Sequence, residues 1–302
     1  MLLDLTSSGD VWTVQAPAKV NLTLRILGRR PDGYHDLESV VAALDWGDTL
    51  TLRRGRTLSL RTRGYAVPEG DGNLVVRAAR ALGRACGTRA GARMDLQKRI
   101  PPGRGLGGGS ADAAAALAGL NGLWGSRLAV ERLAQLGAEV GSDVPLFFGS
   151  PVSVMRGRGD RIEAVAARPR WWMVLVWPGE AKSTADVYAA FDRLGAAAAP
   201  GPAATDILRV LDRPAADAAP YLVNDLEKAA ADIRCTKEGR RALERAGAKA
   251  VGMTGSGSAY FALADTREQA QAWADAAGTE NVETRVVRLL AGTAQQEKTP
   301  CK

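Results

Sequence analysis

The sequence is poor in the residue types that build metal centres, disulfide frameworks and membrane spans. It has a single histidine, His35, and three cysteines at 86, 235 and 301, whose odd number and wide spacing favour neither a disulfide framework nor a zinc site. Aromatic residues make up 5% of the chain. No apolar run approaches the roughly 18 residues of a membrane span, and the start lacks the basic and apolar regions of a secretory signal. We therefore expect a cytoplasmic protein with reduced thiols and no membrane partner.

Positive charge, in contrast, is in excess. The chain has 40 Lys and Arg against 33 Asp and Glu, a net charge of +7, and ten of the arginines lie between positions 53 and 93. Such a cluster fits a nucleic acid, an anionic substrate or simply a solvated face. Because no aromatic residues are interleaved and no nucleic-acid-binding motif is present, we favour the solvated face and expect no nucleic-acid partner.

The length and the apolar patterns predict two domains of mixed helix and strand. With 302 residues and 46% hydrophobic content, two medium cores are a better expectation than one. Strand alternation from 20 to 26 puts Lys19 and Asn21 on the same face. Separate strands are expected at 38–44 and 48–53, and the last part follows a strand-strand-helix-strand order typical of an α+β sandwich. We predict domains at 1–164 and 165–291, followed by a frayed tail at 292–302.

A glycine-packed loop running into an alanine-rich helix is the most informative segment. It spans 100–122, with five glycines among the seven residues 103–109. Glycine permits positive φ and lets backbone N–H groups approach an anion, and the following helix adds the positive end of its dipole. The loop matches neither the P-loop nor the dinucleotide-binding fingerprint. A flexible linker is the alternative, but the two prolines at 101 and 102 stiffen the entry and Ser110 stands where a capping or metal-facing hydroxyl is wanted. We expect the helix to end at Asn121-Gly122.

Three further motifs occur in order with this loop. They are Pro17-Ala18-Lys19-Val20-Asn21-Leu22, Gly28-Arg29-Arg30-Pro31-Asp32-Gly33-Tyr34-His35, and Gly252-Met253-Thr254-Gly255-Ser256-Gly257-Ser258. Together the four segments resemble the GHMP small-molecule kinases through nearly the whole chain. The resemblance implies an N-terminal domain like ribosomal protein S5 domain 2, a ferredoxin-like C-terminal domain, and ATP with Mg²⁺ in the cleft between them.

The resemblance also assigns roles to residues. Lys19 and Asp143 match a catalytic pair, in which Asp143 accepts the proton of the substrate hydroxyl and Lys19 keeps this carboxylate ionised. Ser110 could face phosphate or Mg²⁺, and the metal's other ligands stay open. The residues expected at ATP are Asn73, Lys98, Pro101, Gly103, Gly105, Leu106, Gly107, Gly108, Gly109 and Ser110. Those expected at a small-molecule substrate are Asn21, Tyr34, His35, Thr184, Gly255 and Ser256, with Tyr34 and His35 recognising a cytosine base.

Several of these residues also have plainer interpretations. Asp143 alone could be a helix cap before Pro145, a lone histidine is more often structural, and the glycines at 252–257 fit a hairpin turn nearly as well as a substrate loop. Thr184 rests on a loose local match. Asp112, in the first helical turn, favours the helix dipole but carries negative charge near phosphates, so we expect it to point away. For the assembly we expect a monomer or a weak homodimer.

Overall fold

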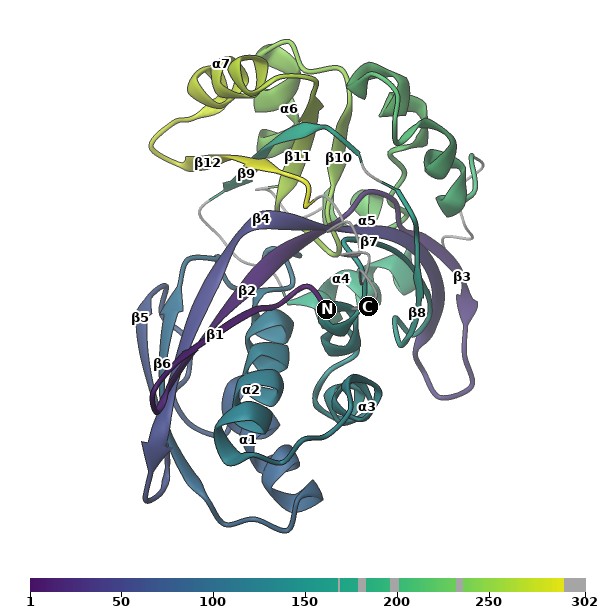
Figure 1. The fold of residues 1–302 in the computed structure, drawn as a ribbon. Helices are drawn as coiled ribbons and strands as arrows, with labels where there is room; N and C mark the ends of the chain where they lie inside the picture. Colours follow the sequence, from purple (N-terminus) through teal and green to yellow (C-terminus); the bar gives the residue numbers. More distant parts are fainter. Residues whose placement is uncertain (168, 179–182, 196–200, 232–235, 291–302) are drawn as a thin grey trace, which may run out of the picture.

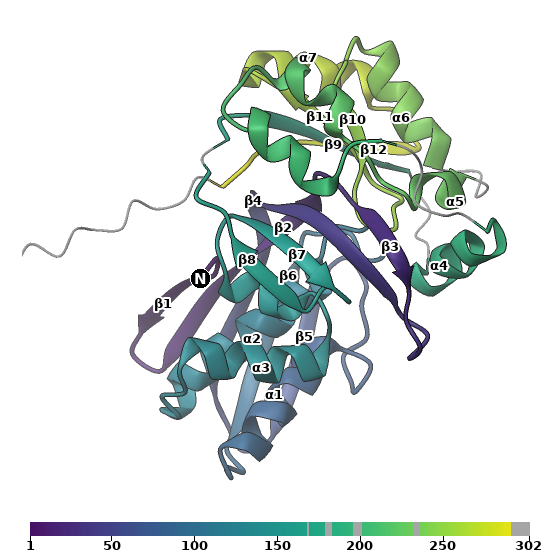
Figure 2. The ribbon, with the colours of Figure 1, turned by 90° about the vertical axis from the view of Figure 1, so that its right-hand side faces the viewer.

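Two β-sheets, each with helices on its outer face, organise the molecule (Figures 1 and 2). The structure is a computed structural model that describes residues 1–167, 169–178, 183–195, 201–231 and 236–290. The predicted α+β class with a two-domain architecture is confirmed. The predicted boundary at 164/165 falls between the last strand of the first sheet and the first strand of the second, and it stays a prediction. The predicted tail at 292–302 lies outside the described residues.

The first sheet has eight strands built around one long central strand, β4. Its main order is β1-β2-β4-β6-β5, β3 and β7 also pair with β4, and β8 pairs with β7. All pairs are antiparallel except β5 with β6. The strands are β1 (Asp4–Ser8), β2 (Val11–Asn21), β3 (Arg25–Arg29), β4 (His35–Gly55), β5 (Leu58–Gly64), β6 (Gly91–Lys98), β7 (Val152–Gly157) and β8 (Arg161–Ala164).

The prediction of separate strands at 38–44 and 48–53 is wrong, because both belong to β4. The interruption of the apolar pattern at Asp45–Asp48 indicated a break between two strands. Strand β2 nevertheless follows β4 through it, with Pro17 opposite Gly47 and a register shift between Pro17 and Lys19. The continuous strand lets β4 pair with β7 through its first half and with β6 through its second.

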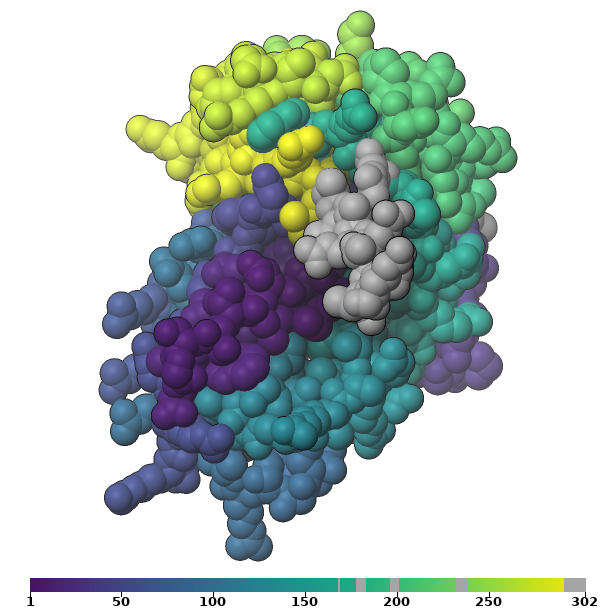
Figure 3. All heavy atoms as spheres, viewed as in Figure 1, coloured from purple at the N-terminus to yellow at the C-terminus, as the bar shows by residue number. Residues whose placement is uncertain are grey.

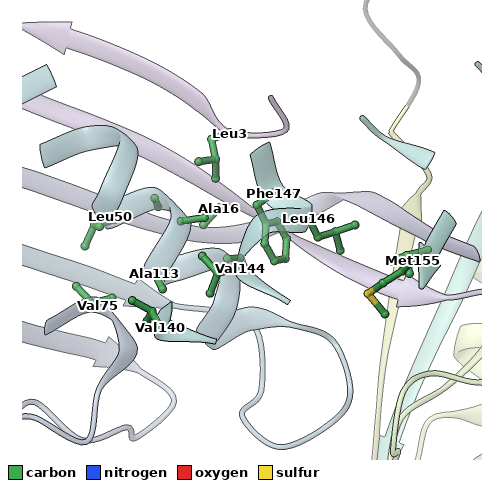
Figure 4. Close-up of a cluster of buried hydrophobic side chains, with 14 of the residues drawn as sticks. Leu3, Ala16, Leu50, Val75, Ala113, Val140, Val144, Leu146, Phe147 and Met155 are labelled. Carbon is green, nitrogen blue, oxygen red and sulfur yellow. The ribbon is translucent and has the colours of Figure 1, made fainter. Parts of the chain in front are cut away.

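Three helices cover one face of this sheet: α1 (Leu74–Ala85), α2 (Gly108–Trp124) and α3 (Val130–Val140). Helix α2 is buried on nearly all sides, which its run of alanines permits. Figure 4 shows Val140, Val144 and Phe147 gathered beside Ala113 of α2. The predicted end at Asn121-Gly122 is wrong: the helix continues to Trp124 and ends at Gly125, whose φ is +69°. Gly122 serves packing instead, because a Cβ there would overlap the ring of Trp12.

The second sheet has four antiparallel strands in the order β10-β11-β9-β12. They are β9 (Trp172–Pro178), β10 (Val251–Met253), β11 (Tyr260–Ala264) and β12 (Val282–Arg288). The helices of this half are α4 (Thr184–Arg193), α5 (Glu227–Ala231), α6 (Thr236–Arg245) and α7 (Arg267–Ala277), with 3₁₀ helices at Ala204–Val210 and Ala215–Tyr221. A further 3₁₀ helix, Val144–Phe148, belongs to the first half and packs on α2 and α3. Helices α6 and α7 pack on the sheet's outer face (Figure 2).

Alternation along the strands explains how the two sheets stack. Ala18 and Val20 of β2, and Leu22 just after its end, face the second sheet, where they share a core with Met173 and Leu175 of β9. Lys19 and Asn21, on the opposite face, turn toward the helices. Figure 3 shows the stacked halves from outside, with the N-terminal strands below and α7 with β12 above. No helix in the described ranges is both long and apolar enough to cross a membrane.

Candidate active site

One cavity of about 820 Å³ collects every site residue that the sequence analysis named. Its walls come from both halves of the chain: β2, the start of β4, the glycine loop and the segment around Asp143 on one side, and helix α4 and the loop after β10 on the other. The size lies within the range of small-molecule sites. The structure thus brings the predicted residues together, while the role of each one stays a prediction.

The glycine loop forms a turn whose backbone is fixed by left-handed residues. Gly103, Gly105 and Gly107 have φ values of +70°, +76° and +71°. A Cβ on Gly105 would overlap the carbonyl of Thr254, and a Cβ on Gly107 would lie 2.7 Å from Cγ of Lys19. Alternating positive φ turns successive N–H groups toward one side, and this is the geometry of an anion nest.

Helix α2 begins at the end of this loop. Gly107 is its N-cap and provides no side-chain cap, so the N–H groups of the first turn, which have no partner within the helix, can serve a ligand. The helix has 17 residues and directs the positive end of its dipole to the same place. Loop and helix together fit a chain of phosphate groups.

Lys19 and Asp143 meet at the centre of the cavity. The Lys19 ammonium donates a 2.6 Å hydrogen bond to Oδ1 of Asn21 and lies 3.5 Å from Oδ2 of Asp143. Lys19 is 4% exposed, whereas the side chain of Asp143 keeps 31% of its surface exposed. Asp143 also caps the 3₁₀ helix Val144–Phe148 by position but makes no side-chain cap bond. Its carboxylate is therefore free for chemistry at the cavity.

Asn21 and Thr254 connect this pair to both neighbouring loops. Asn21 donates through Nδ2 to Ser39 at 2.8 Å, and its backbone N–H donates to the Thr254 hydroxyl at 3.0 Å. Thr254 in turn donates to the carbonyl of Gly105 at 3.1 Å, and the N–H of Lys19 donates to the carbonyl of Leu106 at 3.0 Å. The lysine, the glycine loop and the loop after β10 are thus hydrogen-bonded as one unit.

His35 lies at the other end of the cavity, against helix α4. Its Nε2 is 2.7 Å from Oδ1 of Asp192, and its ring lies 5.1 Å from the ring of Tyr188. Burial first, and then the negative charge of Asp143, raise the pKa of the Tyr188 hydroxyl above its usual range. Tyr34 is 56% exposed, and the guanidinium of Arg158 stands 5.0 Å from its ring centre. The rings and the carboxylate form a pocket that suits a flat, polar ring.

Three other predicted residues line the walls through bonds of their own. The hydroxyl of Thr184 is 3.0 Å from that of Ser256, which joins the start of α4 to the loop after β10. Asn73 is the N-cap of α1: its side chain accepts from the N–H of Val75 and donates to the carbonyl of Pro68. Because the Asn73 amide already makes these two hydrogen bonds, Asn73 serves the cavity mainly by shaping its wall.

Lys98 lies beneath the glycine loop and is paired with carboxylates there. Its ammonium contacts Asp48, from β4, and lies 2.8 Å from Oδ2 of Asp112, in the second turn of α2. All three side chains are almost completely buried. Asp112 is bonded to Lys98 but also lines the cavity, so the expectation that it points away from the phosphates stays a prediction.

Five residues belong to the site or support it but were not predicted from the sequence: Tyr188, Asp192, Arg158, Asp48 and Arg104. The first two are four residues apart on α4, so they share a helix face, and this spacing was the available signal. Arg104, inside the glycine loop, donates to the hydroxyl of Ser258 at 2.8 Å and so ties the loop to the second half of the chain. No pattern in the sequence could have paired these two residues across more than 150 positions.

Residues of the same cavity could also hold the Mg²⁺ that accompanies ATP. Among the described residues, no three His, Cys, Asp or Glu side chains gather into a metal cage. Mg²⁺ normally needs only one or two protein ligands beside the phosphates of a nucleotide. Ser110, in the first turn of α2, and the exposed carboxylate of Asp143 both line the cavity and fit such a shared site.

Family comparisons agree with this geometry. The family described as GHMP kinases N terminal domain matches residues 73–150, and GHMP kinases C terminal matches residues 237–283. Mevalonate kinase from L. major shares the fold, with a TM-score of 0.69 at 17% identity over 96% of this chain and 98% of its own. Fold and site together define a kinase of the GHMP class.

Within this class, the chain is similar over most of its length to several enzymes of one kind. The 4-diphosphocytidyl-2-C-methyl-D-erythritol kinase of Pelotomaculum thermopropionicum is 41% identical over 86% of this chain and 92% of its own, and that of Exiguobacterium sibiricum is 38% identical over 92% and 97%. A crystal structure of 4-(cytidine 5'-diphospho)-2C-methyl-D-erythritol kinase superposes with a TM-score of 0.78 at 35% identity, covering 93% of this chain and 100% of its own. The chain belongs to the family of the 4-diphosphocytidyl-2-C-methyl-D-erythritol kinases.

Proposed function

We propose that this protein transfers the γ-phosphoryl group of ATP to the 2-hydroxyl of 4-diphosphocytidyl-2-C-methyl-D-erythritol, a step of the non-mevalonate route to isopentenyl diphosphate. The observation that carries the proposal is the single cavity that joins a glycine anion nest, the Lys19–Asp143 pair and the His35 pocket. The nest serves the phosphates of ATP, the Lys19–Asp143 pair serves the transferred phosphoryl group and the attacking hydroxyl, and the His35 pocket serves the cytosine base of the substrate.

The glycine loop and the first turn of α2 hold the phosphates of ATP through backbone N–H groups. Phosphoryl transfer asks a protein mainly for positioning and for neutralisation of the charge on the transferring oxygens. Lys19 stands beside the loop, hydrogen-bonded to it through its backbone, so its ammonium is placed to meet the transferred group. Mg²⁺, when bound with ATP, supplies further neutralisation of phosphate charge, with Ser110 and Asp143 as the residues that would face it.

Asp143 accepts the proton of the attacking hydroxyl. As the new O–P bond forms and the bond from phosphorus to the ADP oxygen breaks, the hydroxyl proton passes to the carboxylate and leaves from there to solvent. The Lys19 ammonium lies 3.5 Å from Oδ2 of Asp143 and faces this carboxylate before the step. Because the transition state is loose, this proton transfer contributes on the order of 10²-fold or somewhat more.

His35 and its neighbours hold the cytosine base, and the contacts of Asp192 fix how they do so. The carboxylate oxygen of Asp192 accepts from the Nε2–H of His35, so Nδ1 is the ring nitrogen that is left for the base. The assignment makes His35 a recognition residue and leaves acid–base chemistry to Asp143.

We place the enzyme in the cytoplasm, and we retain the monomer or weak homodimer and the 164/165 domain boundary as parts of the proposal.

The direct test is product formation by the purified protein with ATP, MgCl₂ and the cytidyl substrate. Release of ADP together with a new phosphate ester at the 2-hydroxyl, identified by ³¹P NMR, is expected. Homoserine and mevalonate serve as competing acceptors, and turnover of either one without turnover of the cytidyl substrate would refute the proposal.

The Asp143→Asn variant tests the assigned chemistry. We expect kcat to fall by about 10²-fold or more, while the dissociation constant for ADP changes little. The matched control is Asp217→Asn: Asp217 lies at the start of another 3₁₀ helix, keeps 38% of its side chain exposed and pairs with a cation, Arg213, at 2.9 Å. An unchanged kcat for Asp143→Asn would show that the carboxylate is not the proton acceptor.

A further inference from the structure

Three charged side chains lie buried together under the glycine loop, and two of them, Lys98 and Asp112, also line the cavity. They come from three elements: Asp48 from β4, Lys98 from the end of β6, and Asp112 from the second turn of α2. Each side chain is at most 3% exposed. We call these three residues the Lys98 brace.

We propose that Asp48 and Asp112 are positioning residues, which hold Lys98 as a brace between the two ends of the glycine loop and so fix the loop in the shape that binds nucleotide phosphates. This inference rests on the proposed function, because it concerns the same phosphate site. It changes the role predicted for Lys98 from direct contact with the nucleotide to support of the loop from beneath.

The bonds of Asp48 fix the start of the loop. One carboxylate oxygen, Oδ1, accepts the backbone N–H groups of Arg99 and Ile100, the latter at 2.9 Å, and the other oxygen contacts the Lys98 ammonium. A carboxylate that accepts two backbone N–H groups and one cation determines the direction in which the chain leaves β6. The glycine loop begins at that point.

The bond from Lys98 to Asp112 fixes the other end. Asp112 is held at 2.8 Å through Oδ2, while its Oδ1 is buried with no hydrogen-bond partner in the part of the chain that the structure describes. Gly108, at the start of α2, lies so close that a Cβ would be 2.7 Å from the Lys98 ammonium and 2.9 Å from Ile100. The ammonium therefore closes a ring of contacts from residue 99 to residue 112 around the loop.

The energetics favour a positioning role over a purely stabilising one. Taking ions out of water costs several kcal/mol each, and a buried ion pair is often no better for stability than apolar residues of similar volume. Two carboxylates with one ammonium also leave excess negative charge under an anion site. Burial, above all, raises the pKa of Asp112, which lessens this excess. The benefit of the arrangement is that it fixes the geometry of the glycine loop, because charge-assisted hydrogen bonds are directional.

Two substitutions at Asp112 separate the brace from its alternatives. Asp112→Ala removes the contact but leaves the Lys98–Asp48 pair, and alanine suits a helix that is already rich in alanine. Asp112→Asn removes the charge but keeps an oxygen that can accept from Lys98. Binding of ADP with MgCl₂ by calorimetry is the first readout, and KM for the cytidyl substrate is the second.

For Asp112→Ala we expect ADP to bind about tenfold more weakly, with the substrate KM within about twofold of wild type. Asp112→Asn should rescue ADP binding to within about threefold. Equal ADP affinity in wild type and Asp112→Ala would overturn the brace. Tighter binding in both variants would show that the carboxylate acts as an opposing charge, and equal weakening in both would show that charge rather than contact matters. Each of these results contradicts the proposal.

Controls keep loss of folding apart from loss of the brace. Asp225→Asn is the matched control: Asp225 is 3% exposed, pairs with Arg25 at 3.2 Å and accepts the N–H of Ile26, but it does not line the cavity. It should lower the melting temperature without changing ADP binding. If Asp112→Ala does not fold, Asp112→Ser removes the same contact. Wild-type protein that neither binds ADP nor phosphorylates the substrate would refute the proposed function itself, whereas the brace is refuted only by variants of a protein that does.

Discussion

The two ends of the cavity are built in opposite ways. At the phosphate end, one continuous segment from Lys98 to Asp112 supplies the site, mostly through its backbone, and buried charges support it from below. At the base end, side chains from the start of β4 and from helix α4 meet across more than 150 residues, and Tyr34 and Asp192 remain partly exposed. In the proposed function, backbone geometry holds the phosphates and side-chain pairs hold the base.

This difference separates what the enzyme shares with other kinases from what is particular to it. A polyphosphate presents the same charge in every ATP-dependent reaction, and N–H groups with a helix dipole suffice to bind it. A nucleobase must be told apart by the positions of its donors and acceptors, which requires oriented side chains such as the His35–Asp192 pair. Substitutions at the two ends should therefore affect different kinetic constants.

The largest effect is expected for Gly107→Ala at the phosphate end. A residue with a side chain at φ +71° costs about 1–2 kcal/mol, and the new Cβ would also press on Lys19 at 2.7 Å. Displacing a catalytic group by about 1 Å can cost on the order of 10²-fold, so we expect kcat to fall by about this factor and KM for ATP to rise. Steady-state kinetics with each substrate varied in turn is the measurement.

Helix α2 offers its own control for this prediction. Gly125, at the other end of the same helix, has φ +69°, and a Cβ there would have no neighbour within 4 Å. Gly125→Ala carries the same backbone strain without the contact to Lys19. It should lower the melting temperature and leave the kinetics unchanged. If both variants lose activity equally, strain in the helix rather than the geometry of the loop is responsible.

At the base end, His35→Ala should raise KM for the cytidyl substrate by about 10-fold to 100-fold and leave KM for ATP nearly unchanged. The loss removes a hydrogen bond to the base and a ring that packs on Tyr188, each worth about 1–2 kcal/mol. Asp192→Asn keeps the packing but weakens control of the imidazole tautomer, so a smaller rise in the same constant is expected. A defect confined to ATP would show that the two ends are not separate.

The phosphate end could be predicted from the sequence, because its information is local. Five glycines in seven residues, followed by a helix, indicate an anion nest without any knowledge of the rest of the fold. The shared face of Lys19 and Asn21 follows from strand alternation alone, and their 2.6 Å hydrogen bond confirms it.

The remainder depended on contacts between distant segments. In the sequence, Asp192 looks like any solvent-exposed aspartate on a helix. Its contact with His35 becomes visible only when α4 is packed against β4. Likewise, Lys98 reads as a cation for phosphate until Asp48, fifty residues away, is placed beside it. Gly122 looked like a helix end because local rules do not include the ring of Trp12. In each case tertiary packing decides between two meanings of the same residue.

The smallest expected effect concerns the pH dependence that the buried phosphate end imposes on stability. Burial raises the pKa of Asp112 from 3.8 to about 8, although Lys98 opposes the shift. The two carboxylates raise the pKa of Lys98 despite its own burial, so the lysine stays charged over this range.

A carboxyl whose pKa is higher in the folded state contributes stability below its unfolded pKa, near 4, and loses it as the pH rises through about 8. Between pH 5 and pH 9, the melting temperature of the wild type should therefore fall relative to that of Asp112→Asn by on the order of 5 °C. Parallel melting curves across this range would mean that Asp112 is already ionised in the folded protein at pH 5, and that the phosphate end is as indifferent to pH in this range as any solvated surface.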